Sequence, residues 1–405
     1  MISKNWSGRS VLACGIISLL ASGRGFPQAP PAGPTPAVAL LDAADAAQWQ
    51  AWEKALGWRV VTPAAPQSNA PQANIDLRVQ ELAKAVAAAV RDSGVDPARV
   101  YLAGSGEASA SVFYTISRLP DLWAAAVALG GSPEAAIDTN RLFAANFATV
   151  PILWFGAGAG DEALANRLKA AKIDLDWRPA SAFTGRAVFE WLAARHRDQF
   201  PAEIDCETNS PSYASCFWIQ MTKFDAAERN DVLPSTHLTA SPKPSLDLGA
   251  FGYKIDDPGP GLLISFLPEK YGGPLKMGDR IVALDGRPLA DQRQYNELMA
   301  KYTEEKPVVV AVQRGKDRVR VETRVLLPHS EMMVTARVQA QYLPAEKEIQ
   351  IVSRTVKEMR VTIPPHWAQG GRLYWNGLSL EKVDQPGCLL LTIDKELLHS
   401  APCAN

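Results

Sequence analysis

The chain has 405 residues, of which 47% are hydrophobic and 21% charged, and its formal net charge is −1 at pH 7. Because a single hydrophobic core stops growing near about 250 residues, this length predicts two or three domains. The balanced charge provides no basic excess for a phosphate backbone, so the composition argues against a nucleic-acid partner.

The N-terminus has the pattern of a secretory signal over residues 1–23. Lys4 and Arg9 precede an apolar stretch, Val11 to Ala21, which ends in small residues. A membrane-spanning helix needs about 20 apolar residues, roughly twice what this stretch offers. We therefore expect a cleaved signal, an exported chain that is periplasmic or secreted, and no transmembrane segment in the mature protein. An uncleaved anchor, or a lipid anchor on Cys14, is the alternative.

Residues 24–36 are rich in proline and glycine and should form a flexible leader. From Ala37 to about residue 200, apolar runs of strand length alternate with helical patterns, which predicts a doubly wound α/β domain with helices on both faces of a parallel sheet. The predicted helices cover residues 46–56, 75–92, 108–118 and 184–196.

The run VDPARVYLAGSGEASASVFYTISRLPDLWAAAVALGG resembles the central strand, nucleophile elbow and following strand of the α/β-hydrolase superfamily, in particular its esterase and depolymerase branches. In that family a strand ends in G-x-S-x-G, and the residues two before and two after the serine must be small. Gly106 at the nucleophile position puts Gly104 and Ala108 at the two crowded positions. The fit is good, but glycine supplies no nucleophile.

Placing Ser105 at the nucleophile position instead brings Glu107 to a crowded position, where its side chain would collide with the turn. Ser105 is therefore a poor substitute. If the domain is active, the resemblance implies Ser105 as nucleophile and Asp161 as the acid. Asp161 otherwise suits a helix N-cap, and Glu107 suits the first turn of the following helix. These two carboxylates could also act as an acid–base pair.

The family's catalytic histidine normally precedes the last helix, here the stretch RPASAFTGRAVFEWL, which contains none. His196 lies beyond the apolar positions of that helix. Without a base to accept its proton, a serine hydroxyl is a weak nucleophile at neutral pH. We therefore expect a degenerate hydrolase-like domain that serves as a scaffold.

Once Cys14 leaves with the signal, four cysteines remain, and an even number in an exported chain indicates disulfides. Pairing the sequence neighbours, Cys206 with Cys216 and Cys388 with Cys403, would close short loops, but three pairings are possible. The cysteine spacing matches no zinc pattern and the histidines are scattered singly, so we expect no metal site and no cofactor.

Residues 245–327, which include the run LDLGAFGYKIDDPGPG, resemble the PDZ family over nearly its full length. Four residues match the family's carboxylate-binding loop, whose backbone N–H groups receive a peptide C-terminus. The strand that follows would accept the peptide as an added strand. The loop residues are Ala250, Phe251, Gly252 and Tyr253, and the groove residues are Lys254, Ile255, Tyr295 and Leu298.

The turn dipeptides Gly278-Asp279 and Asp285-Gly286 bracket the alternating run RIVAL, and a helix over residues 291–302 should form the second wall of the groove. Lys254 could favour an acidic peptide, although a lone lysine on an edge strand is often simply solvated. The PDZ-like segment could also act only as a spacer or an intramolecular clamp.

Strand-like alternation in residues 205–241 resumes in residues 331–397, in short runs separated by turns. The later part resembles the accessory β-sandwich of some bacterial esterase-like proteins. We therefore predict a multidomain chain: the α/β domain over residues 37–200, and a β-sandwich into which the PDZ domain is inserted. The expected function is peptide binding without catalysis. The alternative is a serine ester hydrolase that uses Ser105 and recruits substrate through its PDZ.

Overall fold

The computed structural model describes most of the chain beyond the N-terminal region. The described residues are 34–42, 46–63, 75–106, 108–156, 160–228, 230, 232–238, 244–254, 257, 259–327, 334–368, 370–395 and 397–403. The expected signal peptide and nearly all of the expected leader lie outside them. Strand β1 begins at Thr35, slightly before Ala37, where we expected folded sequence to begin.

A six-stranded parallel sheet forms the N-terminal region, in the order β2-β1-β3-β4-β6-β7. All of its neighbouring strands run parallel. Its strands are β1 (Thr35–Leu40), β2 (Arg59–Val61), β3 (Val95–Ser105), β4 (Ala125–Leu129), β6 (Ile152–Gly156) and β7 (Leu175–Pro179). The helices of this region are α1 (Ala46–Leu56), α2 (Ile75–Asp92), α3 (Ala108–Arg118), α4 (Glu134–Ile137), α5 (Asp161–Ala170) and α6 (Gly185–Ala193).

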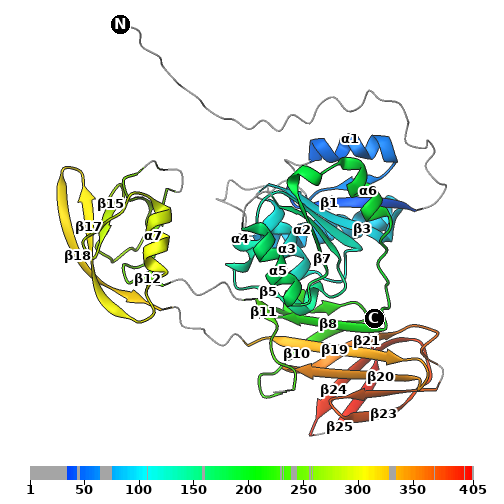
Figure 1. Cartoon of the computed structure of the whole chain (residues 1–405). Coiled ribbons are helices and arrows are strands. Elements are labelled where there is room, and N and C mark those ends of the chain that lie inside the picture. Colours follow the sequence, from blue (N-terminus) through cyan, green and yellow to red (C-terminus); the bar gives the residue numbers. More distant parts are fainter. Residues whose placement is uncertain are drawn as a thin grey trace.

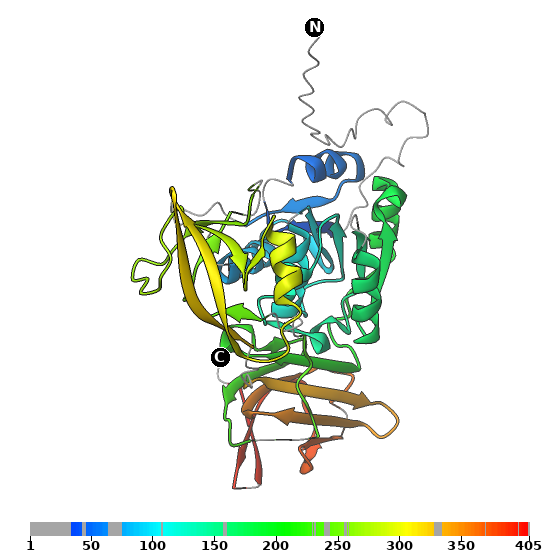
Figure 2. The ribbon, with the colours of Figure 1, turned by 60° about the vertical axis from the view of Figure 1, so that its left-hand side comes forward.

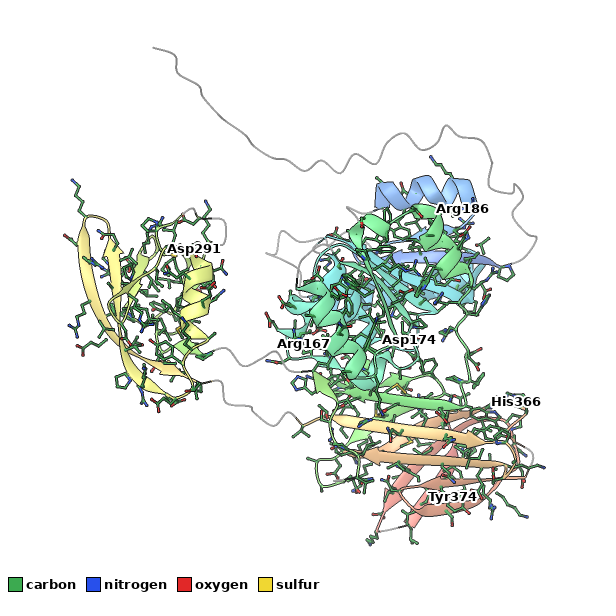
Figure 3. All side chains as sticks on the ribbon, in the orientation of Figure 1. Arg167, Asp174, Arg186, Asp291, His366 and Tyr374 are labelled. Carbon is green, nitrogen blue, oxygen red and sulfur yellow. A yellow bond between two sulfur atoms is a disulfide. The ribbon has the colours of Figure 1, made fainter. Side chains whose placement is uncertain are left out.

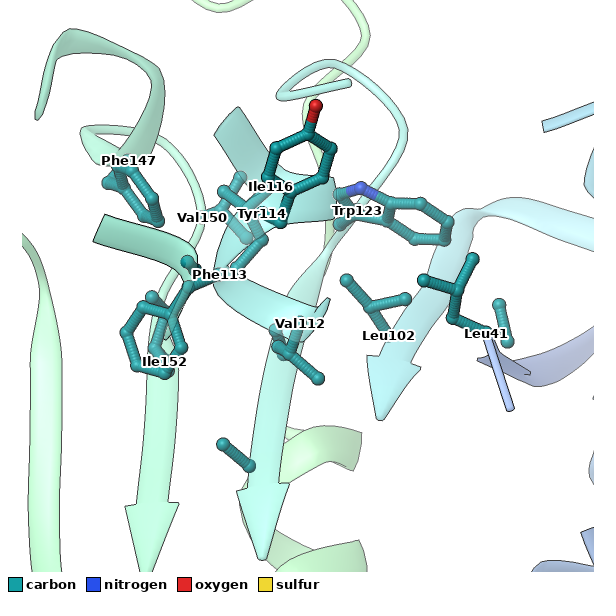
Figure 4. Packing of buried hydrophobic residues seen from close by; sticks show 14 of the residues in the cluster. Leu41, Leu102, Val112, Phe113, Tyr114, Ile116, Trp123, Phe147, Val150 and Ile152 are labelled. Atoms are coloured by element: carbon teal, nitrogen blue, oxygen red, sulfur yellow. The ribbon is translucent and has the colours of Figure 1, made fainter. Parts of the chain in front are cut away.

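Both faces of this sheet are covered by helices (Figure 2). Because side chains alternate along a strand, Leu102 packs with α2, α3 and α5, whereas its neighbours Tyr101 and Ala103 pack with α1 and α6. Figure 4 shows part of the core between the sheet and helices α2, α3 and α5, where Val112 and Phe113 of α3 lie against Leu102 and Ile152 of the sheet. The doubly wound arrangement expected from the sequence is present.

The sequence analysis did not predict the short helix α4, the helix α5 or the edge strand β7. Helix α5 buries only a narrow stripe of small and leucine side chains, and its N-cap, Gly160, makes no side-chain capping bond. Strand β7 has the sequence LDWRP and is mostly half-exposed. Helix α6 is shorter than the range 184–196, because Thr184 is its N-cap and Ala194 its C-cap.

The β-rich region consists of two five-stranded sheets, in the orders β25-β24-β21-β10-β9 and β23-β22-β20-β19-β8. Buried residues from both sheets form one hydrophobic core. The strands are β8 (Glu203–Thr208), β9 (Ser215–Cys216), β10 (Ile219–Phe224), β19 (Ala336–Leu343), β20 (Glu348–Arg354), β21 (Val356–Ile363), β22 (Gly371–Trp375), β23 (Leu378–Val383), β24 (Gly387–Asp394) and β25 (Leu397–Pro402). Strand β25 was not expected and carries this region beyond residue 397.

Two disulfides join sequence neighbours within the β-rich region. Cys206 pairs with Cys216, and Cys388 pairs with Cys403. Of the three pairings that the sequence left open, the structure therefore contains the one that closes short loops. The first bond is buried in the core between β8 and β9.

Residues 244–327 form a body with its own hydrophobic core (Figure 1). Its main sheet has the order β12-β18-β17-β15-β14-β13, and β16 pairs with β15. The elements are β12 (Ser245–Leu246), β13 (Gly252–Tyr253), β14 (Leu262–Phe266), β15 (Arg280–Leu284), β16 (Arg287–Pro288), α7 (Gln292–Met299), β17 (Lys306–Arg314) and β18 (Asp317–Leu326).

Candidate functional site

The turn between β3 and α3 is where the sequence predicted a nucleophile elbow. Strand β3 ends at Ser105, and Gly106 follows in the left-handed region with φ +58°. The Gly106 N–H donates to the Leu129 carbonyl at 2.8 Å, and the Gly106 carbonyl accepts from the Ser109 N–H at 3.1 Å. A Cβ at Gly106 would meet nothing within 4 Å. The turn therefore presents position 106 to open space.

Gly104 is the crowded position of this turn. A Cβ there would lie 2.7 Å from the Ala108 carbonyl oxygen and 3.0 Å from Val112 Cγ2. Just beyond the end of the neighbouring strand β4, a Cβ at Gly131 would lie 2.1 Å from the Gly106 carbonyl oxygen. A side chain at either position would force the turn to shift, because the atoms met are largely backbone. This is the crowding that the placement of Gly106 at the nucleophile position requires.

Ser105 lies one residue earlier, within β3. Side chains alternate along a strand, so Ser105 shares the sheet face of Ala103, which packs with α1 and α6. Gly104, between them, faces α3. The Ser105 side chain therefore lies on the face of the sheet that α1 and α6 cover, and not at the exposed tip of the turn.

Asp161 is the first residue of α5, whose N-cap is Gly160, so it is not itself the N-cap that the sequence suggested. Its side chain is 7% exposed. A Cβ at Gly156 would lie 2.8 Å from Asp161 Cβ, which places Asp161 on the α5 face of the sheet. Ser105 is on the opposite face, and β4 lies between β3 and β6, the strand that precedes α5. The structure does not bring these two side chains together.

The four described histidines all lie away from the turn. His196 is exposed and acts electrostatically on Asp96, near the amino end of β3, more than about 20 Å along the strand from Ser105. His237 pairs with Phe143 at the far end of α3. His366 and His399 belong to the β-rich region, and Figure 3 labels the first. His329 and Glu107 lie outside the described residues.

The predicted carboxylate-binding loop leads into β13, at one edge of the PDZ-like sheet. Gly252 and Tyr253 pair with β14, and the Lys254 N–H donates to the Leu263 carbonyl at 2.9 Å. In the strand order, β13 is terminal, so one of its edges carries no neighbouring strand among the described residues. Ala250 and Lys254 are exposed and Phe251 is half-buried, whereas Ile255 lies outside the described part.

Helix α7 lies beside β13, where the second wall of the groove was predicted. Gln292 Nε2 donates to the Tyr253 hydroxyl at 3.2 Å. Asp291 caps the helix by accepting from the Gln294 N–H at 2.9 Å (Figure 3). Tyr295 is buried in the domain core, and burial, with a smaller effect from Tyr253, raises its pKa to about 12. Leu298 is half-buried at the edge of this core.

A hollow of about 680 Å³ lies elsewhere, on the β15, β17 and β18 part of the same domain. Small side chains, Ala283 and Ala311, contribute to its lining, together with the exposed Arg318 and Arg320. It is separate from the β13 and α7 pair. The sequence pattern did not indicate this hollow, because its lining comes from three strands and a turn.

Over the described parts of the chain, no three His, Cys, Asp or Glu side chains are grouped so that they could hold a metal ion. The helices described there include none with the length and hydropathy needed to cross a membrane.

Known proteins resemble two parts of the chain. Solved structures that match its N-terminal part include esterase PE8 (19% identity, TM-score 0.30, covering 40% of this chain and 91% of that one) and a bacterial heroin esterase (14%, 0.30, 40% and 74%). A thermostable esterase matches at 16% identity and TM-score 0.32, over 42% of this chain and 57% of that one. No curated protein matches the chain.

The likeness to these esterases is distant. The description of the N-terminal region as α/β-hydrolase-like rests on its strand order and on the turn at Gly106. The C-terminal half of the chain contains a match of a different kind, to a protein-family model for the PDZ domain over residues 264–325. Residues 264–325 are therefore part of a PDZ domain.

Proposed function

We propose that this protein is an exported, non-catalytic binding protein whose PDZ domain takes peptide C-termini or exposed strands, with the hydrolase-like domain as its scaffold. The observation that carries the proposal is the edge strand β13, which borders α7 through the 3.2 Å contact between Gln292 and Tyr253. An extended peptide can add to such an edge and gain main-chain hydrogen bonds.

Peptide binding is tested with C-terminally displayed peptides screened against the full chain. Leu298→Ala should lower the affinity for the selected peptides about tenfold, because it removes an apolar side chain beside β13. Arg320→Ala on the opposite part of the domain is the matched control and should leave the affinity unchanged. Failure to select any peptide would favour the spacer role.

The turn at β3 supports the proposed absence of catalysis. Gly106 occupies the position that projects into open space, and glycine carries no nucleophile. Ser105 and Asp161 lie on opposite faces of the sheet, and His196 lies near Asp96, toward the other end of β3 from Ser105. A serine hydroxyl becomes a strong nucleophile only when a base accepts its proton.

A fluorophosphonate probe tests this part directly. We expect no stoichiometric labelling of the full chain. The alternative, a serine ester hydrolase that uses Ser105 with PDZ-mediated recruitment of substrate, predicts labelling that disappears in Ser105→Ala. That result would overturn the non-catalytic assignment.

Export is supported by the two disulfides, because such bonds persist in oxidising compartments. Sequencing the N-terminus of the protein from its native host should find the mature chain beginning near residue 24. A chain that still begins at Met1 would contradict cleavage.

The domain limits proposed here are residues 37–200, residues 245–327, and a β-sandwich made of residues 205–241 with 331–397. Separate hydrophobic cores support them, since the PDZ core draws only on residues between Leu246 and Val325. The β-rich core combines strands from before and after the PDZ domain.

A further inference from the structure

Glu207 of β8 is a buried carboxylate surrounded by hydrogen-bond donors. Its side chain has 0% exposure. Oε1 accepts from the Ser235 hydroxyl at 2.5 Å, from Arg354 Nη2 at 3.0 Å and from the Thr335 hydroxyl. Oε2 accepts from the Thr236 N–H at 2.7 Å and from its hydroxyl at 2.8 Å. We call Glu207, Ser235, Thr236, Thr335 and Arg354 the Glu207 cluster.

Four of the five donor groups come from the two places where the chain leaves for the PDZ domain and returns from it, and the fifth is Arg354 at the end of β20. The outgoing segment, residues 232–238, contains Ser235 and Thr236, and the returning segment, residues 334–337, contains Thr335. Two arginines of the β-rich region also donate hydrogen bonds to backbone carbonyls of the outgoing segment. Arg354 Nη1 donates to the Leu233 carbonyl at 3.0 Å, and Arg337 Nη1 donates to the Pro234 carbonyl at 2.5 Å.

Arg337 also joins the returning segment to β8. Its Nε and Nη2 donate to the two carboxylate oxygens of Asp205 at 2.8 and 2.6 Å. Such a bidentate pair holds both position and orientation. Both segments are therefore attached to the same few residues of β8, around Glu207.

The same residues are bound to the hydrolase-like domain. The Glu207 N–H donates to Asn146 Oδ1 at 2.7 Å, and Asn146 Nδ2 donates to the Glu207 carbonyl at 2.8 Å. Asn146 Nδ2 also donates to the Ser117 carbonyl, near the end of α3. The outgoing segment adds β11 (His237–Leu238), which pairs with β5 (Leu142–Phe143) of that domain.

A buried carboxylate is costly unless every acceptor site has a donor. Each segment supplies part of the donor set, so detaching either one leaves the same charge under-solvated. The cost of opening one segment therefore depends on whether the other is in place. Buried networks of this kind strengthen cooperatively.

We propose that the Glu207 cluster makes the outgoing and returning segments open and close as one unit, and fastens that unit to the hydrolase-like domain through Asn146. The PDZ domain is then held at a single anchoring point and not by two independent linkers. This holds whether or not the PDZ domain binds a peptide.

Hydrogen exchange followed by mass spectrometry on the full chain tests the proposal. In Glu207→Gln, the backbone amides of residues 232–238 and of residues 334–337 should both exchange about tenfold faster or more. The reason is that the glutamine side chain lacks the negative charge to which the five donors bind. Glu203→Gln is the matched control on the same strand. Glu203 accepts from Gln341 Nε2 at 3.2 Å and is not part of the Glu207 cluster, so exchange at both segments should stay at the wild-type rate.

Two milder variants, Ser235→Ala and Thr335→Ala, keep the test decisive if Glu207→Gln does not fold. Each removes a donor from one segment only, and each should speed exchange in both segments. The proposal is overturned if either variant loosens only its own segment, or if Glu207→Gln folds and retains wild-type exchange. Amides of the PDZ core, such as those of β17, should keep their protection in every variant.

Discussion

Asp279 is a turn residue whose carboxylate is held inside the PDZ domain. It accepts from the Lys276 N–H at 2.7 Å and from Arg314 Nε and Nη2 at 2.9 and 2.7 Å. Burial raises the pKa of Asp279, but the bonds from Arg314 and Lys276 outweigh it and hold the pKa below its usual value. The ionised form therefore stabilises the fold of this domain.

The sign of the pH dependence follows from that shift. A folded-state pKa below the unfolded value gives stability that is present above the unfolded pKa, near 3.8, and is lost as the pH falls through the folded pKa. Asp279→Asn should lower the free energy of unfolding of the PDZ domain at pH 7 by about 2 kcal/mol, because the ion pair with Arg314 is broken. Chemical denaturation at pH 7 and pH 3 measures both effects.

Asp317→Asn is the matched control, since Asp317 is exposed in the nearby hairpin. It should change the unfolding free energy by less than about 0.5 kcal/mol. If the loss in Asp279→Asn were as large at pH 3 as at pH 7, the carboxylate charge would not be the cause.

At the scale of elements, the β3–α3 turn depends on two glycines for different reasons. Gly104→Ala places a Cβ 2.7 Å from the Ala108 carbonyl, so the turn must shift, at a cost of about 3 kcal/mol. Gly106→Ala meets no atom and costs only the left-handed backbone strain, about 1 kcal/mol. Thermal unfolding of the two variants compares them. Equal losses would contradict the crowding argument.

The elements that the sequence predicted well are those with strong periodicity. Helices α1, α2 and α3 begin and end where expected, because their apolar positions recur at helical spacing. Helix α5 escaped prediction, since its short stripe of Leu164, Ala165 and Leu168 follows a glycine without a capping side chain. The edge strand β7 escaped because only Leu175 of its five residues is buried.

The turn at Gly106 and the predicted PDZ loop rest on steric rules and turn residues that act locally, and the roles of their residues stay predictions. The Glu207 cluster could not be located in this way. Glu207 occurs in an ordinary polar stretch, and its partners Ser235, Thr335 and Arg354 are distant along the chain. Burial of a charged residue is decided by tertiary contacts that no local pattern records.

At the scale of the whole molecule, the PDZ core is independent of the others. Within the described part of the chain it draws on residues 246–325 alone, and the cores of the remaining described regions use none of these. Replacing residues 239–333 by a short Gly–Ser linker should therefore leave the rest folded, with a Tm within about 4 °C of the corresponding transition in the full chain. Calorimetry of both proteins makes the comparison.

The excised PDZ fragment, residues 244–327, should unfold in a cooperative transition of its own. Aggregation of the shortened chain, or loss of its cooperative transition, would show that the PDZ domain contributes to the stability of the other regions.

The separate core of the PDZ domain also bears on how this gene could have arisen. Because the strands before and after the insertion already meet in one β-rich core, an ancestor without residues 239–333 would have folded around the same residues. A single recombination event could then add the domain without passing through an unfolded intermediate protein. Homologous chains with a short loop at this site are the expected descendants of that ancestor.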